Sequence, residues 1–241
     1  MFLKISNDEA AEFGVHGGMI PQDENLGQKL LLTLRANDPW CAPLVIAGKH
    51  EVFDFTKGYE ADRKLSAPYG IGRYDEDRVG MYETSLFKSG VEPRTVHMGL
   101  DIGAAEGTPI FAPADSALWA YETLTAPGDY GGTIILEVPL PQETAEFSQP
   151  LYMLFGHLSQ VSVGRWKNQN AVQFKKGDLI GWLGGKSENG GWNPHLHWQI
   201  SWLQPLRCDL PGAVTKKNRA FARLTFPDPT PSLRSALAGL D

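Results

Sequence analysis

Four of the six histidines in this 241-residue chain lie in three short segments. The segments are 97–101 (His-Met-Gly-Leu-Asp), 155–159 (Phe-Gly-His-Leu-Ser) and 195–197 (His-Leu-His). Histidines scattered at random would rarely gather beside a carboxylate in this way. Imidazole nitrogens and a carboxylate oxygen suit a borderline-soft cation such as zinc. The pattern therefore predicts one metal site, built from segments that lie far apart in the sequence.

The spacing of His97 and Asp101 places a condition on the local backbone. Glycine and proline, which cost roughly 1 and 3 kcal/mol inside a helix, follow closely at Gly99, Gly103 and Pro109 and argue against a helix here. Four steps of straight strand would separate the two residues by about 13 Å, too far for ligand atoms that lie roughly 2 Å from one metal. We therefore expect a bend between them, at which Gly99 lowers the cost because glycine tolerates positive φ.

Residues 195–200 alternate polar and apolar side chains. As a strand, this segment would send His195, His197 and Gln199 to one face. Two imidazoles and one carboxylate would leave the fourth position of a zinc ion open for water, which is typical of a catalytic site. The sequence contains no His-Glu-x-x-His motif, so a histidine would have to replace the glutamate base of that metalloprotease class.

The ordered set of motifs resembles the lysostaphin/LytM-type zinc endopeptidases, whose usual activity is the cleavage of peptide bonds in bacterial cell-wall cross-links. The motifs are His-x-Gly-x-Asp, Gly-His-Leu-Ser and Pro-His-Leu-His, and the similarity also takes in residues 107–113 and 176–181. The resemblance implies that His97, Asp101 and His197 bind one zinc ion per chain. It also implies that His157 and His195 flank the water that attacks the substrate. The donor set alone leaves other metals open.

Three positions depart from residues that are common in that family. Phe155 stands where tyrosine is frequent, Asn193 where a glycine often precedes the proline, and Trp198 where phenylalanine is frequent. None of the three is an expected ligand or catalytic histidine. These departures bear on substrate preference more than on chemistry.

The middle of the chain predicts a mainly β fold. Short apolar runs separated by turn residues indicate strands at 109–111, 117–122, 133–138, 151–157, 179–183 and 195–202. Short strands joined by turns favour a mainly antiparallel sheet, and the resemblance implies a folded sheet with the metal in a groove across it, with short helices at the periphery. We expect three parts: an accessory segment over 1–93, the zinc peptidase-like domain over 94–207 and a tail over 208–241 that packs on the core.

The two flanking parts carry weaker signals. Residues 24–36 have leucines at helical spacing after Asp23, a possible N-cap, which predicts an amphipathic helix. Residues 54–95 mix many charges with tyrosines and glycines, which favours a solvated, irregular lead-in that wraps the catalytic domain or walls the substrate groove. In the tail we expect a short helix over 232–240.

Composition excludes several classes of partner. The net charge is −6, and no basic cluster offsets it, so nothing favours nucleic acid or an anionic membrane surface. No stretch approaches the about 20 apolar residues of a membrane span, and the N-terminus lacks the apolar region of a signal peptide. The expected location is the cytoplasm, with export by another route left open. Cys41 and Cys208 are expected to be free thiols.

Two functions fit these features. The first is a zinc metalloendopeptidase, a hydrolase acting on peptidoglycan cross-links or related peptides. The alternative is a catalytically silent binding or regulatory module that keeps the peptidase fold. Such relatives usually lose ligands, whereas this chain has all five positions, so the enzyme is favoured. Three aromatic residues, Tyr130, Trp166 and Trp192, are candidates for the rim of the substrate groove.

Overall fold

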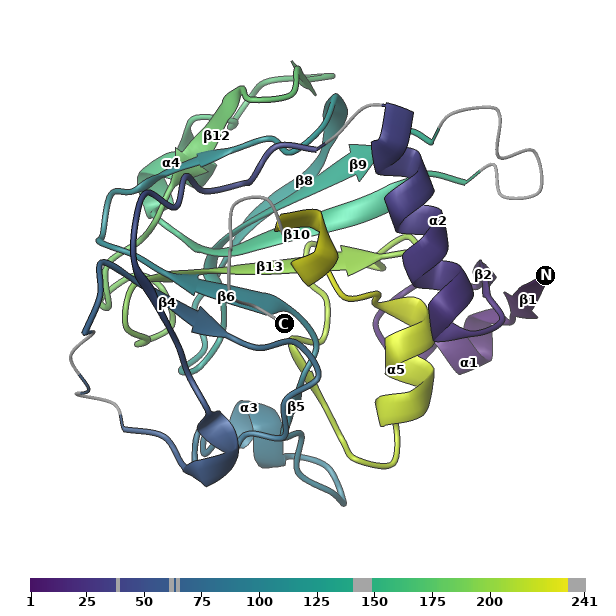
Figure 1. Cartoon of the computed structure of the whole chain (residues 1–241), viewed down its shortest axis with the longest axis horizontal. Helices are drawn as coiled ribbons and strands as arrows, with labels where there is room; N and C mark the ends of the chain where they lie inside the picture. Colours follow the sequence, from purple (N-terminus) through teal and green to yellow (C-terminus); the bar gives the residue numbers. More distant parts are fainter. Residues whose placement is uncertain (38–39, 61–62, 64–65, 141–148, 234–241) are drawn as a thin grey trace.

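The computed structural model describes residues 1–37, 40–60, 63, 66–140 and 149–233. An eight-stranded sheet forms the centre of the molecule, with the strand order β11-β8-β9-β10-β13-β6-β4-β3 (Figure 1). Its strands are β3 (His50–Val52), β4 (Tyr69–Gly72), β6 (Leu100–Gly103), β8 (Ser116–Leu124), β9 (Gly131–Val138), β10 (Leu151–Leu158), β11 (Gln173–Phe174) and β13 (His195–Ser201). Neighbouring strands are antiparallel except β3 and β4, which are parallel.

The expectation of a mainly β, mainly antiparallel fold is confirmed. Three two-stranded sheets accompany the large one: β1 (Phe2–Ile5) with β2 (Gly18–Pro21), β7 (Pro109–Phe111) with β12 (Leu179–Trp182), and β5 (Val96–His97) with β14 (Ala213–Val214). Each of the six strands predicted from apolar runs between turns is present, within two residues at either end. The local pattern of apolar runs and turn residues therefore found these six strands, but it did not find β6 and β11 of the main sheet.

The core lies around the middle strands of the sheet. β10 is buried along its whole length, which agrees with its continuous apolar run from Leu151 to Phe155. On the neighbouring β13, Trp198 is completely buried and pairs in register with Phe155. The two departures from common family residues at these positions thus face each other across two strands and belong to the core.

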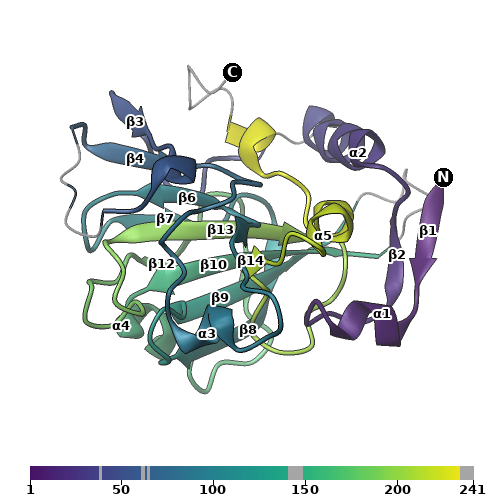
Figure 2. The same cartoon turned by 90° about the horizontal axis from the view of Figure 1, so that it is seen from below.

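Short helices surround the sheet. They are α1 (Asn7–Ala11), α2 (Glu24–Asn37), α3 (Ser85–Lys88), α4 (Gln160–Gly164) and α5 (Arg219–Thr225), with short 3-10 turns at Phe55–Lys57 and Thr230–Leu233. In both views α2 and α5 lie side by side, on the side of the molecule that also carries β1, β2 and α1 (Figure 2). Within the part of the chain that the structure describes, none of the helices combines the length and hydrophobicity that crossing a membrane requires.

The predicted helix over 24–36 is present as α2, and the Asp23 carboxylate caps it by accepting a hydrogen bond of 2.8 Å from the backbone N–H of Leu26. Cys41 and Cys208 are free, as expected. The helix expected over 232–240 lies almost entirely outside the described residues. The tail instead contributes β14 and α5, and α5 packs against α2 and β2.

The lead-in over 54–95, expected to be irregular, differs from that expectation. β4 lies within it and pairs with β6 of the peptidase-like region, with Gly70 opposite Gly103 and Gly72 opposite Asp101. The sequence Tyr-Gly-Ile-Gly gave no strand signal because glycine has no side chain to show alternation and is depleted in strands. The segment before residue 94 therefore extends the main sheet next to the predicted metal ligands.

The expected bend between His97 and Asp101 is present. β5 ends at His97, and β6 begins at Leu100. Gly99 does not have the positive φ that we expected. A β-carbon at Gly99 would instead lie 2.5 Å from Cε1 and 2.6 Å from Nε2 of His197. Glycine is required here because the His197 ring packs directly against the backbone.

Candidate metal centre

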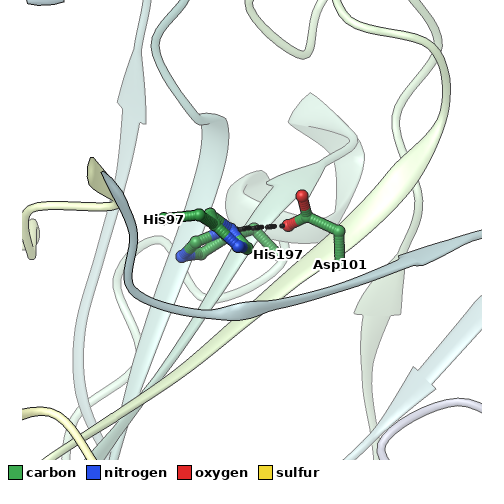
Figure 3. Close-up of side chains that lie close together, drawn as sticks. All are labelled: His97, Asp101 and His197. Carbon is green, nitrogen blue, oxygen red and sulfur yellow. Dashed lines mark hydrogen bonds and ion pairs between the residues drawn. The ribbon is translucent and has the colours of Figure 1, made fainter. Parts of the chain in front are cut away.

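The predicted ligands come together at the junction of β5, β6 and β13. Asp101 on β6 lies directly opposite His197 on β13, and the bend after β5 returns His97 to the same point. The Nε2 atom of His97 lies 3.0 Å from Nδ1 of His197 and 3.2 Å from Oδ1 of Asp101. Nδ1 of His197 and Oδ1 of Asp101 are 3.0 Å apart. Figure 3 shows the two rings and the carboxylate pointing toward one another.

The contacts of His197 place its proton on the nitrogen that faces away from Asp101. Its Nε2 lies 3.1 Å from Oε1 of Gln199 and 3.3 Å from the hydroxyl oxygen of Tyr130. That hydroxyl donates its own proton to the carbonyl of Leu210, at 3.0 Å, so it can accept from His197. Both neighbours therefore act as acceptors for an Nε2–H group. Nδ1 of the neutral ring is then left with a lone pair directed at Asp101.

Two groups compete for the outer nitrogen of His97. Nδ1 lies 2.8 Å from the carbonyl oxygen of Arg73 and 2.9 Å from Nη2 of Arg78. A carbonyl only accepts and a guanidinium only donates, so Nδ1 can satisfy one of them at a time. When Nδ1 carries the proton and donates to Arg73, Nε2 presents a lone pair to Asp101 and His197.

Burial and charge keep this cluster in the protonation state that a metal requires. The pKa of His97 is lowered to about 4, mainly by burial and then by the nearby Arg78 guanidinium, while Asp101 opposes the shift. Burial alone would raise the pKa of Asp101, but His97 and Arg78 outweigh it and hold that pKa well below its usual value of 3.8. At neutral pH Asp101 is therefore an anion and His97 a neutral base.

The three inner atoms fit one small cation. In a tetrahedral site with ligands at about 2.0–2.2 Å, neighbouring ligand atoms lie roughly 3.3–3.5 Å apart, close to the 3.0–3.2 Å found between these atoms. With protons on the outer nitrogens, three lone pairs converge with no donor between them, an arrangement that a bound cation would stabilise. His97, Asp101 and His197 also form the metal-sized group of His, Cys, Asp or Glu found among the described residues.

The two remaining histidines lie beside this cluster. His157 occupies a bulge at the end of β10, where the pairing with β9 shifts register and φ is 63°, an uncommon value for a residue with a side chain. Its ring centroid lies 4.2 Å from that of His195. Nε2 of His195 is 3.9 Å from Oδ1 of Asp101. The structure thus brings all five predicted residues to one place.

Backbone carbonyls orient both of these rings. Nδ1 of His157 donates to the carbonyl of Asn189 at 2.9 Å, and Nδ1 of His195 donates to the carbonyl of Asn193 at 2.7 Å. Burial, the largest cause in both cases, lowers the pKa of His195 and holds the pKa of His157 well below 6.5. Both rings are therefore neutral at pH 7, with Nε2 as the free acceptor.

A pocket of about 430 Å³ connects the five residues with solvent. Of the three aromatic residues considered for its rim, Tyr130 and Trp192 line the pocket. Trp166 is buried elsewhere, and its indole N–H donates to the carbonyl of Ile180 at 3.2 Å. The pocket also includes residues from the lead-in, among them Arg78 and Tyr82, so this segment does wall the cavity.

Sequence reasoning missed two residues that touch the cluster. Gln199 was placed on the same strand face as His195 and His197, and that placement could have indicated its contact with His197. Arg78 donates to Oδ2 of Asp101 at 2.7 Å, but it lies in the charged run 73–78, which resembles a solvated surface. No local signal in that run shows which of its charged side chains are buried.

Residues 95–207 match the model of peptidase family M23. No curated protein matches the chain significantly. The chain is similar to a zinc-containing peptidase from Vibrio cholerae, with 20% identity over 48% of this chain and 32% of that one and a TM-score of 0.33. It is also similar to lysostaphin from Staphylococcus simulans, with 24% identity over 60% of this chain and 47% of that one and a TM-score of 0.36.

A third similar structure is the catalytic domain of the M23 protein EnpA from Enterococcus faecalis, with 18% identity over 62% of this chain and 95% of that one and a TM-score of 0.38. The chain spans less than two thirds of the Vibrio and Staphylococcus structures. The match to the family model agrees with the resemblance to the lysostaphin/LytM-type peptidases that was found in the sequence. It covers residues 95–207, a little less than half of the chain.

Proposed function

We propose that this protein is a zinc-dependent endopeptidase that hydrolyses a peptide bond in peptidoglycan cross-links or in related peptides. The observation that carries the proposal is the convergence of three lone-pair atoms, from His97, Asp101 and His197, with separations of 3.0–3.2 Å. Such a cluster without a cation would be electrostatically unfavourable in a buried place. The match of residues 95–207 to a peptidase family supports hydrolysis as the reaction.

The metal would be held by Nε2 of His97, Oδ1 of Asp101 and Nδ1 of His197. Zinc, when bound, supplies a Lewis acid for the scissile carbonyl and lowers the pKa of water toward about 7. With three protein ligands, a fourth position stays open to solvent and substrate. The pocket gives the substrate access to that position, since all three ligands line it.

His157 and His195 would handle protons beside the metal. Both are neutral, both have Nδ1 held by a backbone carbonyl, and both offer Nε2 as an acceptor. One of them takes a proton from the attacking water. Once protonated, such a ring is a donor for the oxyanion that develops on the carbonyl or for the leaving amine. The positive φ of His157 is a strained backbone conformation of the kind that is often found at functional sites, and it supports a catalytic role for this residue.

The proposal is tested by assaying the purified protein against cross-linked cell-wall peptides and oligoglycine, with and without a chelator. We expect hydrolysis that the chelator abolishes and that stoichiometric zinc restores. Cleavage insensitive to metal removal would contradict the metal-dependent mechanism. A protein that holds zinc and binds these peptides but cleaves none of them would instead be the silent binding module.

A further inference from the structure

Arg78 is a charged side chain in an unusual place. Only 1% of its surface is exposed, although the segment around it is rich in charges and lies outside the region that matches the peptidase family. Its guanidinium stacks over the ring of Phe55, with 4.9 Å between the guanidinium carbon and the ring centroid. Taking a charge out of water costs several kcal/mol unless it is paired and hydrogen-bonded. A buried arginine beside a candidate metal centre therefore requires an explanation.

The fork of Arg78 joins several groups around the site. Nη1 donates to Oδ2 of Asp101 at 2.7 Å and to the hydroxyl of Tyr82 at 3.0 Å. Nε donates to Oε2 of Glu76 at 3.3 Å. The oxygen of Asp101 that Arg78 binds is the one that does not face the two histidines, which contact Oδ1. Arg78 thus occupies one carboxylate oxygen and leaves the other for the metal.

The backbone around Arg78 is adapted to this contact. Gly72 on β4 lies opposite Asp101, and a β-carbon there would be 2.7 Å from Nη2 of Arg78 and 3.2 Å from Oδ2 of Asp101. Only glycine leaves room for the fork to reach the carboxylate. The turn at Asp75 has φ of 55°, and Arg219 of α5 holds the Asp75 carboxylate through Nε at 2.7 Å and Nη2 at 2.9 Å.

Backbone hydrogen bonds fix the same turn to the strand that carries His97. The N–H of Asp75 donates to the carbonyl of His97 at 2.8 Å, and the N–H of His97 donates to the carbonyl of Glu76 at 3.0 Å. The N–H of Arg78 donates to the carbonyl of Thr95 at 2.9 Å. Residues 73–78 therefore move with the ligand strand, so Arg78 keeps its position relative to both His97 and Asp101.

We infer that Arg78 is a positioning residue of the metal centre, which holds Asp101 so that a single oxygen, Oδ1, is presented to the metal. The lead-in over 54–95 then contributes a positioning residue to the metal centre. This inference rests on the proposed metal site but makes a separate claim. The planar fork matters as well as the charge, since a lysine ammonium cannot contact Asp101, Glu76 and Tyr82 in the same fixed geometry.

The test compares the full-length protein with Arg78→Met, Arg78→Lys and a control, Arg63→Met, which removes an arginine ion pair with Glu51 on the outer strand β3, away from the ligands. Zinc affinity is measured by competition with a chelator. Partners of metal ligands typically contribute 10–100-fold to affinity. We expect Arg78→Met to weaken zinc binding by that factor, Arg78→Lys to restore only part of it, and Arg63→Met to bind zinc as the parent does.

A second readout distinguishes positioning from general destabilisation. The proteins are loaded with Co²⁺, whose visible absorption weakens as the coordination number rises. Released from Arg78, Asp101 can bind with both oxygens, so both Arg78 variants should absorb more weakly than the parent and the control. If Arg78→Met does not fold, Arg78→Lys decides. The inference is overturned if Arg78→Lys shows parental zinc affinity and an unchanged cobalt spectrum. A parent protein that binds no zinc would instead overturn the proposed metal site itself.

Discussion

The two groups of site residues share one pocket but are held in different ways. His97, Asp101 and His197 are almost completely buried, and side chains such as Arg78 and Gln199 contact them. His157 and His195 are held by backbone carbonyls at Nδ1, and His195 keeps 13% of its side chain exposed. The first group is built to fix atoms around a point, and the second to leave one nitrogen of each ring free. Under the proposed function, the first group binds the metal and the second group transfers protons.

Removal of a proposed metal ligand should have the largest effect and tests the difference between the two groups of residues. Asp101→Ala deletes the only anion among the three inner atoms, so we expect zinc binding to fall by more than the 10–100-fold that loss of an outer partner causes and hydrolysis to be lost with it. Elemental analysis after dialysis checks the metal content. Asp115→Ala, which removes an exposed carboxylate paired with Lys175, is the matched control and should keep its zinc.

The second group is tested by His157→Ala and His195→Ala. Neither variant removes an inner atom, so both should retain about one zinc per chain while turnover falls by a factor on the order of 10² to 10³. Metal content and initial rates are measured on the same preparation. The exposed His16 provides the control, because His16→Ala should change neither quantity. Loss of zinc from either site variant would place that histidine in the first group.

A smaller effect is expected from Gln199→Leu. This change removes the acceptor for the Nε2–H of His197, so the ring is less firmly held with Nδ1 toward the metal. Zinc affinity should fall about 10-fold, the lower end of the range for such partners. Chelator competition gives the affinity, and Gln173→Leu on the exposed edge strand β11 is the control. Unchanged affinity would show that Tyr130 alone orients His197.

A separate effect concerns the stability of the metal-free protein in acid. A folded-state pKa of about 4 for His97, against 6.5 in the unfolded chain, means that the unfolded state binds a proton that the folded state does not. The contribution of His97 to the free energy of unfolding is therefore fully present above pH 6.5 and is lost as the pH falls toward 4. At pH 5 the loss from His97 alone is about 2 kcal/mol. Urea unfolding of chelator-treated protein at pH 8 and pH 5 measures this, and His97→Gln should lose that part of the difference.

The sequence predicted the site best where the local order of polar, apolar and glycine residues also determines the backbone conformation. Alternation over 195–200 placed His195, His197 and Gln199 on one face, and the glycine-rich spacing of 97–101 required the bend that the structure has. Six strands followed from apolar runs and turns, namely β7, β8, β9, β10, β12 and β13, whereas the two-residue β11 was not predicted. The reason for Gly99 was wrong, because the approach of the His197 ring across strands is a tertiary contact that no local pattern records.

Residues before the peptidase region were harder to predict for the same reason. β4 contains two glycines, and one of them, Gly72, makes room for Arg78, so the strand character of β4 depends on partners in other segments. Arg78 lies among other charged residues, so its sequence context gives no sign of burial. Only the three-dimensional arrangement shows that its side chain is buried against Asp101. The division of the chain at residue 94 and the expected location stay predictions.

Anomalous diffraction at the zinc absorption edge, from crystals grown without added metal, tests the proposed zinc site most directly. We expect one strong peak per chain, within bonding distance of Nε2 of His97, Oδ1 of Asp101 and Nδ1 of His197, with no bond to His157. A peak coordinated by His157, or a fully occupied metal elsewhere in the chain with none at this cluster, would contradict it.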